Sequence, residues 1–369
     1  MRFAVRIHQS GWTYSELENV WGESERLGYD GASLYDVLGA PGPECWTALT
    51  ALTRATHKLV AVPLVLSNPY RHPAVVAKMA ATLDALSGGR IILGLGAGGS
   101  ADDAAAFGVQ WPSAEQRIAA LGEAVEVMRM LWRGGGSFGG RWYELRDAPG
   151  YPGVSRPEGP PVLIGGHGRN LLRIAARHAD LCNVGFDLSV GDWHRLRRRL
   201  ADQAREAGRP PDSPGLVHNA TVLLGADEAD VARQVSQWAD RRRLTEEAAR
   251  SRLRHSLSGT PREVCEQLRA LEAAGVSWVF LLFDSLPSLE GLRSFAEAVM
   301  PDLRSVRSSP SDLPSHPTVP MAVVDQGASA TAQLSLRSMG RTSSANWVRK
   351  RSWSWPGPWT TRWEKPAST

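Results

Sequence analysis

The 369-residue sequence is poor in cysteine, and its three cysteines, Cys45, Cys182 and Cys265, lie far apart. This spacing excludes a disulfide scaffold and a CxxC zinc or redox site, and it suits a reducing compartment. The sequence also lacks a run of about 18 apolar residues, which a membrane-spanning helix needs. Its first residues, MRFAVRIHQSGWTY, contain no apolar stretch typical of a secretory signal. We therefore expect a cytoplasmic protein without a membrane partner.

Several catalytic patterns are missing as well. The sequence contains no HExxH motif, no HxH after its first apolar stretch and no GxSxG motif, and its nine histidines are scattered. No cysteine has a nearby activating partner. We therefore expect no metal site. These absences favour chemistry carried by an organic cofactor, which the protein binds and orients.

Positive charge is concentrated at the C-terminal end. The segment 303–369 holds nine Lys or Arg and three Asp or Glu, so residues 1–302 carry a net charge of −2 although the whole chain carries +4. This Ser/Pro/Trp-rich segment shows no sustained period of 2 or 3.6 residues, which predicts a disordered basic tail. Its stretch VRKRSWSWPGPW alternatively fits a membrane surface or a nucleic acid. Because the excess charge is confined to the tail, we expect no nucleic-acid partner for residues 1–302.

Residues 1–302 alternate short apolar stretches with longer amphipathic ones. The predicted strands are Phe3–Ile7, Gly31–Tyr35, Leu59–Leu66, Ile91–Leu95, Pro161–Ile164, Asp180–Val184, Leu216–Leu224 and Trp278–Phe283. The predicted helices are Tyr14–Leu27, Ala74–Leu86, Ala114–Trp132, Arg169–His178, Gly191–Ala207, Asp227–Trp238 and Pro261–Ala274. Eight strands alternating with helices favour an α/β fold, a closed (β/α)8 TIM barrel, over an open doubly wound sheet. A long insert after the fourth helix, Gly134–Pro160, is predicted as a small hairpin and loop, either a substrate lid or a surface decoration.

In such a barrel the chemistry belongs at the C-terminal ends of the strands. The glycine-rich stretch from Gly94 to Gly99 follows the fourth strand and leads into a predicted acidic loop, Ser100–Asp103. A dinucleotide-binding fingerprint would instead open directly into a helix. We interpret these glycines as allowing close approach of the backbone to a ligand. The stretch Gly165-Gly166-His167-Gly168 precedes a predicted helix, where exposed amides at a helix N-terminus bind phosphate. A plain tight turn is the alternative for this stretch.

The region from Leu66 to Gly98 resembles a known family. It contains the stretches PYRHPA, AKMAATLD, LSGGR and LGLGAG, and further matches occur at Phe3–Gln9, Gly140–Tyr143 and Gly259–Pro261. Together they make residues 1–302 similar to the bacterial luciferase-like monooxygenase superfamily. The resemblance implies a (β/α)8 barrel that uses reduced flavin or the deazaflavin coenzyme F420, and it does not extend to the tail.

The resemblance also implies a non-prolyl cis peptide at the end of the third strand, in a bulge that supports the central ring of the cofactor. The matching bond is Ser67–Asn68, and the adjacent Asn68–Pro69 bond is the alternative. A cis bond before proline costs only about 0.5–1 kcal/mol, against about 3–4 kcal/mol for other residues. The cofactor-binding residues implied by the resemblance are Asp36, Ser67, Asn68, Ala97, Gly98, Gly165, Gly166, His167 and Gly168, the last four around the phosphate.

Two positions depart from the pattern of deazaflavin dehydrogenases in this family. Several of those enzymes have a proton-transferring His after the acidic residue that matches Asp36, where this chain has Val37. They also have a Glu after the strand-four glycines, where this chain has Gly99. The catalytic residue therefore stays open, with Asp36 and His8 as candidates.

These features predict an oxidoreductase that transfers a hydride to, or oxygenates, a small organic substrate with reduced coenzyme F420. An FMN-dependent monooxygenase of the same fold and a non-catalytic cofactor-binding protein are the alternatives. The family often dimerises, so a homodimer is also expected.

Overall fold

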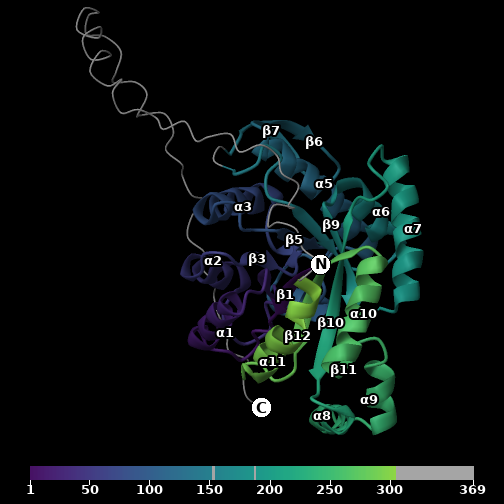
Figure 1. Cartoon of the computed structure of the whole chain (residues 1–369). Coiled ribbons are helices and arrows are strands. Elements are labelled where there is room, and N and C mark those ends of the chain that lie inside the picture. The colour runs from purple at the N-terminus through teal and green to yellow at the C-terminus, as the bar shows by residue number, and fades with distance from the viewer. Residues whose placement is uncertain (152–153, 187, 305–369) are drawn as a thin grey trace, which may run out of the picture. The chain divides into compact units, whose positions relative to one another are not determined.

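The computed structural model describes residues 1–151, 154–186 and 188–304, and Figure 1 shows a twisted parallel sheet wrapped by helices. The strands of this sheet are β1 (Arg2–Arg6), β2 (Gly31–Leu34), β3 (Val60–Pro63), β4 (Leu66–Ser67), β5 (Leu93–Gly96), β8 (Val162–Gly165), β9 (Leu181–Phe186), β10 (Gly215–Leu224), β11 (Leu257–Gly259) and β12 (Val276–Phe283). Each of the eight predicted strands is confirmed, the third of them in two pieces.

The sheet closes on itself into the predicted barrel. The strands follow one another in the order β3-β2-β1-β12-β10-β9-β8-β5-β4, and all of these pairs are parallel. The ring is completed between β3 and the start of β5. There the Ala61 amide donates to the Arg90 carbonyl over 3.0 Å, and the Ile92 amide donates to the Ala61 carbonyl over 3.1 Å. Because the strands are parallel, their C-terminal ends share one rim of the barrel.

Helices cover the outside of this barrel. They are α1 (Tyr14–Arg26), α2 (Cys45–Ala55), α3 (Pro73–Ser87), α4 (Ala101–Ala106), α5 (Ala114–Trp132), α6 (Arg169–His178), α7 (Val190–Glu206), α8 (Glu228–Arg241), α9 (Glu246–Arg252), α10 (Pro261–Ala273), α11 (Glu290–Ala298) and α12 (Met300–Arg304). Several begin at the caps that their sequences offer. Thr13 with Glu16, Ser113 with Gln116 and Thr260 with Glu263 form capping boxes, which satisfy free amides of the first turn. Within the described residues, no helix is long and apolar enough to cross a membrane.

Side chains alternate between the inside and the outside of the barrel. Those that fill its interior are buried and apolar: Ala4, Val62, Leu64, Ile92, Leu163, Val217, Trp278 and Phe280. The neighbouring residues on each strand, such as Phe3 and Val5 on β1, pack outward in the layer under the helices. Because alternate side chains on each strand are apolar on both faces, the polar side chains considered below lie mainly at the strand ends.

The third strand is interrupted where the sequence predicted one continuous stretch. The cis peptide bond lies between Leu64 and Val65, three residues before the predicted Ser67–Asn68 bond, and the Asn68–Pro69 bond is not cis either. Both predictions for the cis bond were therefore wrong. Asn68–Tyr70 form a 3₁₀ turn, η1, with Pro69 in its first turn. Proline fits that position because its fixed φ already suits a helical start.

Other departures concern the connections. The predicted hairpin in the insert is confirmed as β6 (Gly135–Gly139) and β7 (Glu144–Pro149), which pair antiparallel. The segment Ser100–Asp103, predicted as a loop, instead begins α4, because the Ser100 hydroxyl accepts the Asp103 amide as an N-cap. After β10, α8 confirms the predicted helix Asp227–Trp238, and α9 and β11 are additional elements. The predicted tail lies outside the described residues from 305 onward.

Candidate active site

The carboxylate of Asp36 lies just beyond β2 and is fully engaged by the protein. It receives two hydrogen bonds from the Arg71 guanidinium, at 2.7 and 3.0 Å, and one from the Ser67 amide at 2.9 Å. The same guanidinium also donates to Glu44, which caps the start of α2. The Asp36 side chain is only 2% exposed. Such a saturated carboxylate fixes the ends of two strands in place, and both of its oxygens are occupied by donors of the protein itself.

A second cluster joins the ends of β1 and β2. The Gln9 side chain accepts from the Tyr35 amide over 2.9 Å and donates to the Tyr35 carbonyl over 2.6 Å. The Arg6 guanidinium donates to the Tyr35 hydroxyl and lies 4.7 Å from the centre of its ring. On its other side the same guanidinium lies 3.9 Å from the ring of Phe186 at the end of β9. Arg6 is therefore stacked between two aromatic rings across the barrel mouth.

His8, one of the two catalytic candidates, lies at the edge of this stack. Its ring is exposed and packs against Tyr35, with 4.5 Å between the ring centres. Partial burial and the nearby Arg6 charge lower the pKa of His8 below its ordinary value of 6.5. His8 is consequently neutral at pH 7. No contact joins His8 to Asp36 among the described residues, so the two candidates belong to separate clusters.

Asn68 connects the rim to the inserted hairpin. Its side-chain amide donates to the Tyr143 hydroxyl over 3.0 Å, and the His72 ring meets the same tyrosine edge-on. The hairpin is held in turn by Glu123 on α5, whose carboxylate accepts the backbone amides of residues 141, 142 and 143. The insert is thus tied to the end of the third strand, although its role as a substrate lid stays a prediction.

The glycines of β5 make room for the interrupted strand. A Cβ at Gly96 would lie 2.7 Å from one methyl group of Val65, and a Cβ at Gly165 would lie 2.8 Å from the other. At Gly94 a Cβ would collide with the Pro63 carbonyl. We had expected the glycines between 94 and 99 to allow the approach of a ligand. At Gly94 and Gly96 the space is instead filled by the chain itself, and Val65 lies partly buried between the ends of β5 and β8, packed against the barrel interior.

Ala97 and Gly98 lie beside a partly buried tryptophan, Trp111. A Cβ at Gly98 would lie 3.0 Å from the Ser67 hydroxyl and even closer to the Trp111 ring, so Trp111 occupies the space that the glycine leaves. The Ala97 carbonyl accepts from Arg117 over 2.9 Å, and this guanidinium stacks 4.1 Å from the Trp111 ring centre. The structure therefore brings Ser67 and Gly98 together, as predicted for residues around one ligand, but it covers Gly98 with an indole.

The loop from Gly165 to Gly168 ends at the first turn of α6. Gly168 is the N-cap with φ +101°, it makes no side-chain cap, and a Cβ there would meet nothing within 4 Å. The first-turn amides of a helix have no partner within the helix, and here this turn lies at the surface, since residues 167–170 are all exposed. The Gly166 amide is not among them, because it donates to the Asn183 carbonyl over 2.9 Å. An anion can be held at Gly168 and the start of α6, but not at Gly166.

Sequence reasoning missed several residues of this rim. Arg6 and Tyr35 were inside predicted strands, Arg71 was only part of a matching stretch, and Tyr143 was in the insert. Of these, only Arg71 could have been suspected, because a cation within the PYRHPA stretch is expected to pair with a nearby acid. The other contacts join residues from distant parts of the chain.

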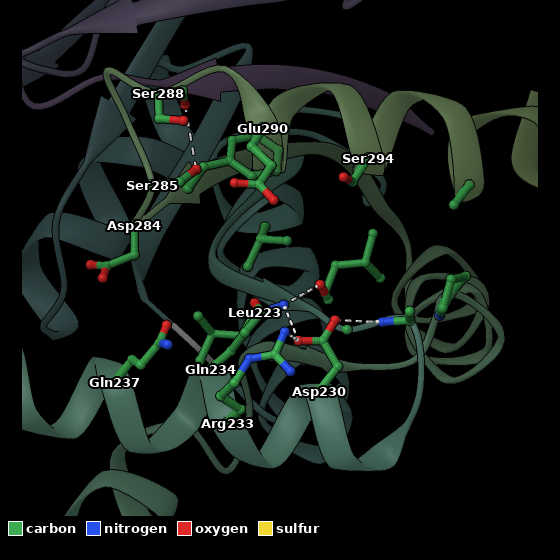
Figure 2. Close-up of a pocket in the computed structure, with 18 of the residues that line it drawn as sticks. Leu223, Asp230, Arg233, Gln234, Gln237, Asp284, Ser285, Ser288, Glu290 and Ser294 are labelled. Carbon is green, nitrogen blue, oxygen red and sulfur yellow. Dashed lines mark hydrogen bonds and ion pairs between the residues drawn. The ribbon is translucent and has the colours of Figure 1, made fainter.

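A large hollow lies away from these residues. Its volume is about 940 Å³, and it opens between α8 and α11 beyond the ends of β10 and β12. Figure 2 shows polar side chains from both helices facing it, including Gln237, Glu290 and Ser294. Its charged groups are largely paired within the protein, Asp230 with Arg233 and Asp284 with Arg241. None of the predicted site residues lines this groove.

Comparisons with known proteins identify relatives of the chain. A family model described as luciferase-like monooxygenase matches residues 1–277. The chain is 29% identical over 250 residues to an F420-dependent glucose-6-phosphate dehydrogenase of Microbacterium testaceum, covering 65% of this chain and 73% of the relative. A protein of the same name from Nakamurella multipartita is 30% identical over 253 residues, covering 65% of this chain and 72% of the relative.

Solved structures share the fold. A riboflavin lyase with modified FMN and riboflavin superposes with a TM-score of 0.72 at 18% identity, covering 83% of this chain and 91% of the other. An F420-dependent secondary alcohol dehydrogenase with an F420-acetone adduct gives a TM-score of 0.68 at 19% identity, covering 83% and 99%. At these identities the likeness concerns the fold alone, and it agrees with the closed barrel described above.

Proposed function

The chain belongs to the luciferase-like monooxygenase family, and we propose that it is an oxidoreductase that works with reduced coenzyme F420 on a small organic substrate. The relatives with about 30% identity are named as F420-dependent dehydrogenases, and this supports F420 over FMN. The cofactor would lie across the C-terminal rim of the barrel, where the predicted site residues gather. When bound, it supplies a hydride carrier.

The observation that carries this proposal is the open first turn of α6. A phosphate of the cofactor would be held by the free amides after Gly168, where the positive end of the helix dipole favours an anion. His167 and Arg169 are both exposed beside this turn and add donors to it. The residues present therefore fit a phosphate-bearing cofactor at the place that the family resemblance implies, with Gly168 rather than Gly166 at its centre.

Val65 would support the ring of the cofactor. It lies partly buried between the ends of β5 and β8, packed against the apolar interior of the barrel, and its side chain fills the space that the three glycines around it leave. This role was predicted for Ser67 and Asn68, whose side chains are buried and face Gly98 and Tyr143 instead. Asp36 would act as a positioning residue, because it fixes the Ser67 amide and the Arg71 side chain rather than facing a ligand.

FMN also carries a phosphate, so it remains the alternative cofactor for the same turn, with monooxygenation as the corresponding reaction. The experiment that separates the two is a titration of the purified protein with F420 and with FMN, followed by cofactor fluorescence. We expect saturable binding of F420 that is at least about 10-fold tighter than that of FMN, which corresponds to about 1.4 kcal/mol. Tighter binding of FMN would favour the monooxygenase, and binding of neither would contradict the proposal.

A non-catalytic family member is the third possibility from the sequence. Such a protein would bind the cofactor, but no substrate would oxidise or reduce the bound cofactor. A screen of alcohols, ketones and enones, with F420 absorbance as the readout, distinguishes this case from an enzyme.

A further inference from the structure

Given the proposed function, the geometry points to an uncharged and largely apolar substrate that carries a hydrogen-bond acceptor, rather than a sugar phosphate. Three features of the rim support this class of substrate. They are the uncharged surface at the ends of β1 and β2, the pairing of the arginines on the rim, and the hydroxyl group of Tyr35.

The surface beside His8 and Tyr35 carries no acid, lysine or arginine. A small hollow there, with a volume of about 10 Å³, has an apolar side formed by Val37, Ala40 and two prolines, and a polar side formed by His8, Gln9, Ser10 and Tyr35. Val37 is 43% exposed, and Phe186 on the opposite side of Arg6 is 39% exposed. The hollow has room for about one water molecule, so a substrate would cover it and contact its rim. Exposed apolar groups beside a cofactor site favour an apolar ligand.

The arginines at the strand ends are already engaged. Arg71 is held by Asp36 and Glu44. Arg117 donates to the Ala97 and Pro112 carbonyls, and Arg241 and Arg242 both donate to Asp284. Arg6 lies between two rings and donates to Tyr35. The open first turn of α6 would be taken by the cofactor phosphate. A second phosphate, on a substrate, would have to break one of these pairs, which costs free energy.

Tyr35 offers a fixed hydrogen-bond donor at this uncharged surface. Its oxygen accepts from Arg6, so its own hydrogen stays available, and no described residue accepts it. Gln9 fixes the Tyr35 backbone on both its amide and its carbonyl. A carbonyl or quinone oxygen above the hollow would accept this hydrogen. A single well-placed polar group in an apolar surface orients a ligand without demanding that it be charged.

The test compares two probes on the full-length protein, both cofactor-free and loaded with F420. Menadione is a neutral bicyclic quinone, and glucose 6-phosphate carries two negative charges. Isothermal titration is expected to give saturable binding of menadione and at least about 10-fold weaker binding of glucose 6-phosphate. Glucose 6-phosphate is also expected to leave the F420 absorbance unchanged.

Two variants locate the binding surface. Val37→Asp places a carboxylate on the apolar rim and should weaken menadione binding by about 10-fold or more. Tyr35→Phe removes the donor and should weaken it by about 5-fold. Leu86→Asp is the matched control, because Leu86 is 49% exposed in the last turn of α3, and it should leave binding unchanged.

Three results would overturn the inference. They are reduction of F420 by glucose 6-phosphate, absence of menadione binding in both forms of the protein, and equal effects of Val37→Asp and Leu86→Asp. Failure of F420 itself to bind would contradict the proposed function instead, and the comparison of the two probes on cofactor-free protein would still decide the substrate class.

Discussion

The side-chain amide of Asn68 donates a hydrogen bond to the Tyr143 hydroxyl over 3.0 Å, although the two residues are 75 positions apart. One belongs to the turn after the third strand and the other to the inserted hairpin. This bond is therefore the direct polar link between the insert and the cofactor rim.

Replacing Tyr143 with Phe should weaken that link. The variant leaves the Asn68 amide without its partner in a buried site, so we expect a loss of about 1–2 kcal/mol in the free energy of unfolding. Urea denaturation followed by circular dichroism measures it. Tyr14→Phe is the control. The Tyr14 hydroxyl is exposed, and its hydrogen bond to Glu18 is long, at 3.5 Å, so losing it should cost little stability. Equal stability of Tyr143→Phe and the wild type would show that the link contributes nothing.

Asp36→Asn should be strongly destabilising. The asparagine side chain has one acceptor oxygen, so it cannot accept both Arg71 hydrogen bonds and the one from the Ser67 amide. The largely buried positive charge of Arg71 then keeps only Glu44 as a negatively charged partner. We therefore expect the free energy of unfolding to fall by about 2–4 kcal/mol. Asp202→Asn removes an exposed ion pair with Arg205 and should cost at most about 0.5 kcal/mol. Similar losses in the two variants would contradict the structural role of Asp36.

Gly96→Ala should disturb the interrupted strand. The new methyl group would lie 2.7 Å from Val65, so the short valine side chain or the backbone must move. We expect the free energy of unfolding to fall by about 1–3 kcal/mol and the cofactor to bind more weakly. Gly99→Ala is the matched control, because a Cβ there meets nothing within 4 Å. If Gly96→Ala is as stable as Gly99→Ala, then Val65 is not confined as described.

His218 should make the protein sensitive to mild acid. It is fully buried on β10 and accepts the Trp193 indole N–H over 3.1 Å, and burial lowers its pKa from 6.5 to about 4. Between pH 6.5 and 4 the unfolded state binds the proton first, so stability is lost as the pH falls through this window. Full loss amounts to about 3 kcal/mol.

The measurement for His218 is the change in the free energy of unfolding between pH 7 and pH 4.5. We expect this change to be about 2–3 kcal/mol smaller in His218→Gln than in the wild type, even if the variant is less stable at pH 7. His57→Gln, at an exposed position, should behave like the wild type. A His218→Gln variant with an unaltered pH dependence would show that the buried imidazole does not govern this window.

Asn170→Asp tests the phosphate site at α6. The change is nearly isosteric and adds a negative charge to the first turn, where it stabilises the helix by about 0.3–1 kcal/mol. The same charge should repel a cofactor phosphate and weaken F420 binding by about 5- to 10-fold, an effect that shrinks with added salt. Asn19→Asp, on the exposed face of α1, should leave binding unchanged. If the start of α6 does not hold the cofactor phosphate, Asn170→Asp and Asn19→Asp should bind F420 equally well.

Much of the fold was predictable because its signals are local. Apolar stretches bounded by glycine or proline identified all eight strands, and capping residues identified the starts of several helices. The helix α4 was missed because Asp102 and Asp103 suggested a loop. Acidic residues are in fact favoured in the first turn of a helix, so the same residues indicate its start.

The details of the site were less predictable because they depend on contacts between distant residues. Leu64, Val65 and Leu66 look like one apolar run, and nothing in that run marks the interruption. The information lies instead on other strands, where Gly94, Gly96 and Gly165 lack the side chains that would block Val65. Likewise, Asp36 was predicted to face the cofactor. Its actual partner, Arg71, is 35 residues away, and sequence spacing alone cannot pair them.

The break in the third strand divides its main-chain pairing between two neighbours. Before the break, β3 pairs with β2, and after it β4 pairs with β5. At this seam the Ser67 amide, which has turned away from β2, is satisfied by the Asp36 carboxylate. At this seam a side chain takes the part that the carbonyl of a neighbouring strand plays elsewhere in the wall, so a substitution at Asp36 acts directly on main-chain pairing.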